Sequence, residues 1–471
     1  MARLSEKIGY GFGDMASSMF WKVFSYYLPI FYANIFGLSL VDAGVLVLIT
    51  RIWDAVSDPM MGIIADRTHS RWGKYRPYLL WMSIPFSVCG VLLFTTPDLA
   101  YGAKLVWAYC TYILMMTVYT GINVPYGAML GVMTDNPHEK TVFSSFRMFF
   151  AYGGSFVALF LWEPMCSLFA QKFDVTPATS WQFAMVMIAA CCLILFVLAF
   201  CLTREHLRTE STVSIASDFK ALMRNKPWWI MIGAALCSNL FNTVRGATVA
   251  FFFVDVIGAD AQLPLGPLGT LLFYSGLFLG IGEVANMVGV ALAVPITRVI
   301  GKKPTFMLVN ACLIVLSVIF FMLPLSPTGY WWMLLLQVVI SICTGIMSPL
   351  VWAMYADVSD YAELEYKTAS TGLIFSSASM AQKFGGAIGG AAVLWLLNAF
   401  GYIQPDVTAA STAAIVQPQS ALSCLWWLMS FIPAAVAALA VVVVWFYPLT
   451  TQRVNDIVEQ LKVQRAEKAT A

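Results

Sequence analysis

The chain has 471 residues, of which 60% are hydrophobic and only 11% are charged, and its mean hydropathy is +0.78. This composition excludes an ordinary soluble protein and indicates one that crosses a membrane many times. The formal net charge is +2 and the basic residues lie in many short loops rather than in one stripe, which argues against a nucleic-acid partner.

Twelve apolar segments are long enough to cross about 30 Å of hydrocarbon, which takes roughly 20 residues of α-helix. No small-residue cleavage site closes the first segment, and Asp14 and Lys22 interrupt it, so we expect it to be retained rather than removed as a signal peptide. The predicted spans are residues 10–34, 40–65, 77–97, 104–132, 143–168, 181–203, 228–257, 269–297, 304–325, 330–356, 369–401 and 421–448.

These spans predict an all-α membrane protein with twelve transmembrane helices in two six-helix, pseudo-symmetric bundles. The only long polar stretch inside the membrane portion follows the sixth span and separates the two sets. We therefore predict an N-terminal bundle (residues 1–203), a cytoplasmic linker (204–227), a C-terminal bundle (228–448) and a cytoplasmic tail (449–471) that forms at most a short amphipathic helix.

The distribution of basic residues predicts the orientation. An even number of spans places both termini on one side, and most of the 27 Lys and Arg residues fall on that side. Because basic loops remain in the cytoplasm, we expect both termini to be cytoplasmic in a protein of the inner cell membrane. Lys104 and Lys172 fall on the other side, and the basic residues within spans are Lys22, Arg51, Arg245 and Lys383.

A short basic loop follows the second span, and a similar loop, residues 295–303, follows the eighth. The first loop reads Gly-x-x-x-Asp-Arg-x-x-x-x-x-Gly-Lys from Gly62 to Lys74 and contains Asp66 and Arg67. This pattern resembles that of the major facilitator transporters. The resemblance implies the major facilitator fold, with Asp66 and Arg67 in a gate that braces one half against the other. The alternative is a basic loop that only sets the topology.

Two carboxylates, Asp54 and Asp58, lie four residues apart in the second span and therefore share one helix face. A charged side chain near the bilayer centre costs roughly 2.5–3.5 kcal/mol on insertion scales, and such residues usually mark an ion or substrate path. All three His residues lie in predicted loops, so a cation or proton site must be built from carboxylates. We predict that this pair binds a monovalent cation; the alternative is a structural ion pair with Arg51 or Lys383.

Charged residues of the C-terminal half are candidates for coupling and gating. Lys383 lies on the Gly-rich eleventh span, which can approach the second span closely, and it is either a coupling residue or a buried countercharge. Asp357 and Asp360 begin an acidic run at the end of the tenth span. That run is either a solvated loop or a gate that pairs with Arg147 or with the basic residues 71–76.

Neutral oxygen ligands and aromatic rings are candidates for binding a solute. Thr120 and Asn123 lie in the fourth span beside Pro125, whose missing N–H frees a backbone carbonyl. Such oxygens suit small cations and sugar hydroxyl groups; the alternative is a kink needed only for packing. Tyr26 and Trp352 could stack on a sugar ring, although single aromatic residues in spans more often serve packing.

Together these residues resemble the glycoside-pentoside-hexuronide:cation symporter family, and the likeness covers nearly the whole chain. The resemblance implies that Asp54, Asp58 and Thr120 form a site for Na⁺, Li⁺ or H⁺ with help from Lys383, and that Ser57 lies near the cation. The segments that carry the resemblance are residues 10–13, 51–55, 58–62, 71–74, 111–114, 119–120 and 356–361.

The chain departs from galactoside-carrying members of the family at the sugar site. Those members hold the sugar with two carboxylates on spans one and four, and here the two places carry Ser18 and Asn123. We therefore expect a glycoside, pentoside or hexuronide rather than a galactoside, with hydroxyl recognition by Ser18 and Asn123 and accommodation of a uronate by Lys22 or Arg51. The remaining residues predicted to bind substrate are Asp14, Tyr26, Arg147 and Trp352.

The overall prediction is a monomeric secondary transporter in a lipid bilayer that needs no cofactor and couples inward flow of Na⁺ or H⁺ to uptake of a sugar or glycoside. One alternative is a carrier of an amphiphilic lipid or drug-like solute on the same fold. Another is a membrane sensor, which would carry a large soluble signalling domain. An enzyme is not expected, because no nucleophile-base or metal motif appears.

Overall fold

A computed structural model describes residues 3–134, 137–206, 222–265, 269–366, 371–405 and 415–470. The first half contains α1 (Leu4–Ile30), η1 (Phe31–Phe36), α2 (Leu40–Asp66), α3 (Pro77–Trp81), α4 (Ser83–Leu93), α5 (Tyr101–Met133), α6 (Pro137–Phe173) and α7 (Pro177–Leu202). The second half contains α9 (Lys226–Phe252), η2 (Phe253–Ile257), β1 (Gln262–Pro264), β2 (Thr270–Leu272), α10 (Ser275–Ile300), α11 (Lys302–Phe321), α12 (Pro327–Tyr366), α13 (Thr371–Ala399), α14 (Gln419–Met429), α15 (Phe431–Trp445) and α16 (Thr451–Thr470).

These helices account for the twelve predicted spans. In the described part of the chain, nine helical segments are long and apolar enough to cross a membrane by themselves. The other three spans are α1, α2 and the pair α3 and α4. The helices α1 and α2 carry several charged residues each, and the third span is divided into two short helices.

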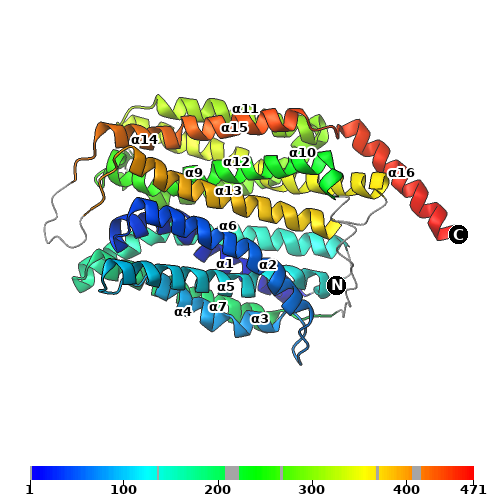
Figure 1. The fold of residues 1–471 in the computed structure, drawn as a ribbon, viewed down its shortest axis with the longest axis horizontal. Helices are drawn as coiled ribbons and strands as arrows, with labels where there is room; N and C mark the ends of the chain where they lie inside the picture. Colours follow the sequence, from blue (N-terminus) through cyan, green and yellow to red (C-terminus); the bar gives the residue numbers. More distant parts are fainter. Residues whose placement is uncertain are drawn as a thin grey trace.

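The helices form two bundles, α1 to α7 and α9 to α15, which lie one above the other in Figure 1. Both termini lie at the same end of the molecule, here called the termini end; the opposite end is called the far end (Figure 1). The bundles contact each other along α2 and α13, along α6 and α10, and along α1 and α9. These contacts come from the second and eleventh, the fifth and eighth, and the first and seventh spans. Exchange of the two halves puts the second span in the place of the eighth and the eleventh in the place of the fifth. The contact between α2 and α13 therefore corresponds to the contact between α6 and α10, as pseudo-symmetry requires.

The first helix of each bundle ends in the same way. The helix α1 continues into the π-helical segment η1, and α9 continues into η2. Gly37 then ends η1 with φ of 84°, and Gly258 ends η2 with φ of 87°, both in the region that favours glycine. This shared ending supports the interpretation of the halves as two related repeats.

Two predicted spans are interrupted by proline. The third span breaks at Met82, and Pro85 lacks the N–H that would bond the carbonyl four residues earlier. The twelfth span breaks at Ser430, where Pro433 likewise leaves the Met429 carbonyl without its helical donor. The predicted kink at Pro125 does not interrupt its helix, because α5 runs continuously from Tyr101 to Met133.

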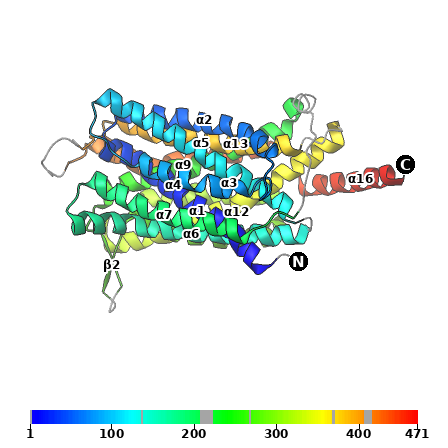
Figure 2. The same cartoon turned by 90° about the horizontal axis from the view of Figure 1, so that it is seen from below.

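Three further segments differ from, or extend, the predictions. The eighth span was predicted from residue 269, but β2 pairs with β1 in a hairpin and the helix begins at Ser275. Figure 2 shows this hairpin projecting sideways from the far end. The tail forms the 20-residue helix α16, which extends beyond the bundle (Figures 1 and 2). Most of the predicted linker, residues 207–221, lies outside the described residues.

Glycine allows α10 and α12 to pack with their backbones in contact. A Cβ atom added at Gly289 would lie 3.0 Å from the carbonyl carbon of Ile342, and one added at Gly345 would lie 3.0 Å from Cα of Asn286. Neither backbone can yield as a flexible side chain would. Small residues at such crossings let transmembrane helices approach closely, which holds the second bundle together.

We therefore expect Gly345→Ala to lower the free energy of unfolding by roughly 1–3 kcal/mol, the usual effect of overpacking. Gly153→Ala on α6 is the matched control, because nothing lies within 4 Å of an added Cβ there. The measurement is the midpoint of thermal inactivation of the detergent-solubilised protein, followed by size-exclusion chromatography. Equal midpoints for the two variants would contradict the close packing described.

Candidate functional site

The two carboxylates of the second span meet a hydroxyl group of the fourth. Thr120 Oγ1 lies 3.1 Å from Asp54 Oδ1 and 3.0 Å from Asp58 Oδ1. Ser57 Oγ lies 3.3 Å from Thr120 Oγ1 and donates to the Asp54 backbone carbonyl at 3.1 Å. Since a hydroxyl group has one hydrogen, Thr120 can serve only one carboxylate at a time. This leaves carboxylate lone pairs available to a cation.

Lys383 of α13 supplies the positive charge at this cluster. Its Nζ forms an ion pair with Asp58 Oδ2 and lies 3.1 Å from Asp54 Oδ2. Asp54 is fully buried, whereas the Asp58 side chain is 26% exposed and the Lys383 side chain is 20% exposed. The cluster therefore has a closed side at Asp54 and an accessible side at Asp58 and Lys383.

Small residues bring α2 and α13 together so that Lys383 can reach the carboxylates. A Cβ atom added at Gly390 of α13 would lie 3.0 Å from Val47 of α2. A Cβ atom added at Gly44 of α2 would lie 2.7 Å from Cδ1 of Trp395, whose Nε1 donates to the Val41 carbonyl at 3.3 Å. These contacts cross from one bundle to the other, so the cluster is completed by both halves.

A central cavity of about 430 Å³ lies beside the cluster and includes Lys383 in its wall. This volume falls within the roughly 300–1,000 Å³ typical of small-molecule sites. The first bundle contributes Trp21, Lys22, Ser25, Tyr26, Arg51 and Tyr152. The second contributes mainly hydroxyl and amide side chains: Ser238, Asn239, Asn242, Thr243, Asn286, Thr344, Ser348, Ser379 and Gln382, together with Met347, Val351, Lys383 and Gly386.

The residues predicted to bind substrate are distributed over several places. Lys22 and Tyr26 lie in the cavity wall. Ser18 lies one turn before Lys22 on α1, Asn123 lies one turn after Tyr119 on α5, and Trp352 follows the lining residue Val351 on α12, with its ring 6.2 Å from that of Tyr355. Asp14 and Arg147 pair with each other at 2.8 Å. Among the described lining residues, the members of this predicted set are Lys22 and Tyr26, together with Arg51, which was expected as an alternative to Lys22 for a uronate.

The polar wall of the second bundle was missed in the sequence, although its spacing carried a signal. Ser238, Asn239, Asn242 and Thr243 recur at helical spacing within the apolar sequence of α9, and therefore share a face. Thr344 and Ser348 lie one turn apart on α12. Polar residues are costly in a span unless they face a cavity or a partner, so this periodicity could have been used.

Comparison with known proteins identifies the family. Residues 9–451 match the MFS/sugar transport protein family.

The chain belongs to this family.

Three relatives illustrate its range. The inner membrane symporter YicJ of Escherichia coli is 31% identical, with 97% of this chain and 95% of that protein covered. The isoprimeverose transporter of Lactiplantibacillus pentosus is 32% identical, with 86% and 82% covered, and the glucuronide carrier protein homolog of E. coli is 29% identical, with 96% and 94% covered. The predicted membership in the glycoside-pentoside-hexuronide:cation symporters is confirmed, and these proteins are transporters rather than enzymes.

Solved structures of other transporters share the fold. A bacterial homologue of the human drug peptide transporters PepT1 and PepT2 aligns with a TM-score of 0.70 at 11% identity, covering 98% of this chain and 100% of that one. The nucleoside transporter NupG aligns with a TM-score of 0.63 at 13% identity, covering 94% and 99%. The predicted all-α major facilitator fold of this family member is confirmed.

A second ion pair joins the two halves of the transporter beside the cavity. Lys22 Nζ of α1 lies 2.6 Å from Glu283 Oε1 of α10 and 3.3 Å from the Tyr26 hydroxyl. Glu283 is 2% exposed, and its Oε2 has no hydrogen-bond partner in the described part. Arg245 lies close by in a smaller pocket and donates to Gln337 Oε1 at 2.8 Å and to the Met429 carbonyl at 2.9 Å. The proline break after Met429 thus supplies an acceptor for a buried guanidinium.

The predicted gating residues lie towards the termini end. Asp357 pairs with Lys302 at 2.6 Å within the second half, and Lys302 belongs to the loop that repeats the first basic loop. Asp360 lies one turn after Asp357 on α12. Arg67 follows α2 and is exposed, whereas the side chain of Asp66 lies outside the described part of the structure. A gating role for these residues stays a prediction.

Hydrogen bonds join the two halves at the far end. Tyr402 accepts from Asn34 Nδ2 at 3.0 Å and donates to Asp255 Oδ2 at 2.7 Å, and Gln404 Nε2 donates to the Ala33 carbonyl at 2.7 Å. Asn34 and Ala33 belong to η1 of the first half, whereas Tyr402 and Gln404 follow α13. These bonds must break if the cavity is to open towards the far end.

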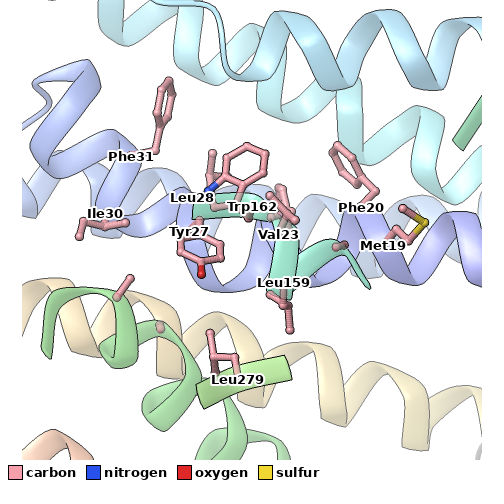
Figure 3. Packing of buried hydrophobic residues seen from close by; sticks show 14 of the residues in the cluster. Met19, Phe20, Val23, Tyr27, Leu28, Ile30, Phe31, Leu159, Trp162 and Leu279 are labelled. Carbon is pink, nitrogen blue, oxygen red and sulfur yellow. The ribbon is translucent and has the colours of Figure 1, made fainter. Parts of the chain in front are cut away.

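A carboxylate also joins the two halves near the far end, where α6 meets α10. Glu163 accepts from the Tyr27 hydroxyl at 2.9 Å and from the Ser275 hydroxyl at the first residue of α10. Tyr274 donates to the Phe160 carbonyl at 2.8 Å. Acidic groups are stabilised at helix N-termini, where free N–H groups point outward. Figure 3 shows Tyr27, Leu159 and Leu279 of α1, α6 and α10 packed in the hydrophobic cluster at this contact.

We expect Glu163→Leu to raise the population open to the far end about tenfold or more, because each lost charge-assisted hydrogen bond is worth roughly 1.5–3 kcal/mol. The measurement is the rate at which an impermeant maleimide applied from the far side labels Ser238→Cys, which lies in the cavity wall, in a protein without its other cysteines. Asp174→Asn, just beyond α6, serves as the control. An unchanged labelling rate in Glu163→Leu would show that this contact does not hold the far end closed.

Proposed function

We propose that this family member is a cation-coupled symporter that carries a sugar or glycoside into the cell. The single observation that supports coupling most directly is the cluster in which Asp54, Asp58 and Thr120 share their hydrogen bonds with the ammonium group of Lys383 beside a polar cavity. A cation that enters the cluster has to compete with Lys383 for the same carboxylate oxygens. Cation binding is thereby linked to the position of Lys383, which lines the cavity.

The proposed cation site consists of Asp54, Asp58, Ser57 and Thr120. Carboxylate and hydroxyl oxygens are the ligands that hard cations prefer. A bound cation or proton cancels one of the two negative charges, as the ammonium group of Lys383 does in the empty carrier. Unbalanced buried charge is therefore lower in the carrier that holds a cation than in a carrier whose two carboxylates have no positive partner. It is also lower in the empty carrier, where Lys383 takes the place of the cation. The coupling ion is Na⁺ or H⁺.

The proposed sugar site is the central cavity. Amide and hydroxyl side chains such as Asn239, Asn242 and Thr344 can exchange hydrogen bonds with sugar hydroxyl groups, and Trp21 and Tyr26 offer aromatic faces. Ser18, Asn123 and Trp352 would join this site in another conformation of the carrier, and Asp14 with Arg147 would close it towards the termini end. The many hydroxyl and amide side chains in the wall disfavour an amphiphilic lipid or drug-like substrate.

The proposed setting is the inner membrane with both termini in the cytoplasm, and one chain as the working unit. The far end would then face outward, and alternating access would rock the halves about the cavity. The relatives named for isoprimeverose and for glucuronide indicate that neutral and acidic sugars are both carried within the family.

The test is uptake of radiolabelled glycosides, pentosides and uronates by proteoliposomes that contain the purified protein, with Na⁺ and pH gradients imposed separately. We expect at least one sugar to accumulate above its outside concentration under one of the two gradients. Vesicles without protein provide the background. If no sugar accumulated under either gradient, symport of a sugar by this protein would be refuted.

A further inference from the structure

The hairpin of β1 and β2 exposes apolar side chains at the far end of the transporter. Leu271 is 38% exposed and Leu272 is 48% exposed, and they lie on opposite faces of the hairpin because neighbouring side chains alternate along a strand. Residues 261–282 contain no Asp, Glu, Lys, Arg or His. Exposed strands in water usually carry charged side chains that prevent association. The composition of this hairpin therefore does not fit a segment surrounded by water.

The direction of the hairpin places it beside the helix ends rather than beyond them. Figure 2 shows it projecting sideways from the bundle, at the level of the far ends of the helices. A helix of roughly 20 residues crosses the hydrocarbon, so the ends of the spans lie near the two surfaces of the bilayer. The hairpin therefore extends along the membrane surface at the far end.

Aromatic residues at the start of α12 mark the depth of the hairpin. Trp331 and Trp332 are 39% and 54% exposed, and Trp331 Nε1 donates to the Pro264 carbonyl of β1 at 3.2 Å. The ring of Phe273 stacks on that of Tyr330, with the centroids 5.2 Å apart. Exposed tryptophan and tyrosine side chains are concentrated where hydrocarbon meets the headgroups. These contacts hold the hairpin at that boundary.

The backbone of the hairpin suits the headgroup region better than the hydrocarbon core. The outer edges of a two-stranded hairpin carry N–H and C=O groups that need water or headgroups as partners. Pro264 has no N–H, and its carbonyl accepts from Trp331. Between the strands, the Leu265 N–H donates to the Gly269 carbonyl at 2.8 Å. Exposed leucines on such a backbone make the hairpin amphiphilic.

A second copy of the chain fits this surface less well than lipid does. Stable protein interfaces bury at least about 1,000 Å² in total. The strands β1 and β2 have three residues each, and Leu263 of β1 is already buried. Strands this short cannot supply such an area by themselves. Lipid has no minimum area of contact, because it covers any apolar surface at this depth.

We propose that the hairpin is inserted between the phospholipid headgroups and the acyl chains of the far-end leaflet, with Leu271 and Leu272 in contact with lipid. The hairpin connects η2 to α10. Asp255 of η2 accepts from Tyr402, and Ser275 of α10 donates to Glu163. Insertion therefore fixes the depth of two elements that make hydrogen bonds near the far end.

The test attaches the polarity-sensitive fluorophore NBD to Leu272→Cys in a protein without its other cysteines, reconstituted in vesicles of phosphatidylethanolamine and phosphatidylglycerol. We expect blue-shifted emission and weak quenching by iodide in the water. Lipids with a nitroxide near the headgroup should quench more strongly than lipids with a nitroxide near the chain end. Asp98→Cys, at an exposed carboxylate in the connection between α4 and α5, is the control that iodide should quench strongly.

Leu271→Asp tests whether apolar contact holds the hairpin in the membrane. We expect the inserted population to fall about tenfold or more, because burial of one leucine is worth roughly that factor, and iodide quenching at Leu272→Cys should rise accordingly. If this variant does not fold, as judged by size-exclusion chromatography, Leu271→Ser replaces it in the same comparison. Unchanged iodide quenching in the folded variant overturns the proposal.

Two other results also overturn it. Iodide quenching as strong at Leu272→Cys as at Asp98→Cys would show that the hairpin lies in water. Protection from both iodide and the nitroxide lipids, with disulfide cross-linking of Leu272→Cys between two chains, would show that a second copy covers the hairpin.

Discussion

We expect Asp58→Asn to abolish gradient-driven accumulation of sugar and to weaken cation binding by roughly two orders of magnitude, while some sugar binding remains. Asp58 shares the Thr120 hydroxyl with Asp54 and pairs with Lys383, and its side chain forms the accessible side of the cluster. Removing one member of a hydrogen-bonded charge cluster in a low-dielectric site commonly costs about 2–5 kcal/mol. The measurement compares uptake under an imposed gradient with exchange of labelled sugar at equal concentrations on both sides.

Asp42→Asn provides the matched control on the same helix. Asp42 lies at the far end of α2, where it accepts a hydrogen bond from Ser39 Oγ at 2.7 Å and bonds to the Tyr101 hydroxyl. We expect this variant to accumulate sugar as the unaltered protein does. Cation stimulation that survived in Asp58→Asn would show that the coupling ion binds elsewhere.

The second large effect is expected at the pair formed by Lys22 and Glu283. Glu283→Gln leaves a buried ammonium group without its carboxylate, and loss of one member of a buried pair costs roughly 3–5 kcal/mol. Because the Lys22 side chain is 24% exposed, we expect a value near the lower limit of that range. The measurement is the thermal inactivation midpoint of the solubilised protein, which should fall clearly.

The double variant Lys22→Met with Glu283→Leu separates the charge from the packing. Replacing both members of a buried pair by apolar residues is often neutral for stability, so we expect the midpoint to recover. Recovery with loss of uptake would indicate that the pair serves transport. If Glu283→Gln alone left the midpoint unchanged, solvent in the cavity would already satisfy Lys22, and the pair would not stabilise the contact between halves.

The sequence was sufficient to predict the fold because the bilayer imposes a strong constraint. A chain with twelve apolar segments and basic loops on one side has few ways to satisfy its backbone hydrogen bonds. Details that depend on single backbone breaks were not predicted. The twelfth span divides at Ser430 because Pro433 removes a donor and Arg245 takes the freed carbonyl, a partner 184 positions away in sequence. Hydropathy contains no information about such a long-range bond.

The candidate site was predictable where it depends on local spacing and only partly where it depends on packing. Asp54 and Asp58 were identified because their spacing fixes a shared face, and the resemblance added Thr120 and Lys383. Lys22 was recognised as a charge within a span, but its partner Glu283 lies in the other half and no local pattern joins them. The polar wall on α9 was overlooked because its residues are uncharged, and attention to uncharged residues at helical spacing would have found it.

The most direct test of the account is a titration of the purified, sugar-free protein with Na⁺, with Li⁺ and, separately, with protons, monitored by calorimetry. The account predicts one saturable cation or proton site, strongly weakened in Asp54→Asn and in Asp58→Asn and tightened in Lys383→Gln, since the competing ammonium group has then been removed. Binding of the same ion with unaltered affinity in Asp58→Asn, or weaker binding in Lys383→Gln, would contradict the claim that Lys383 and the coupling ion compete for the Asp54 and Asp58 carboxylates.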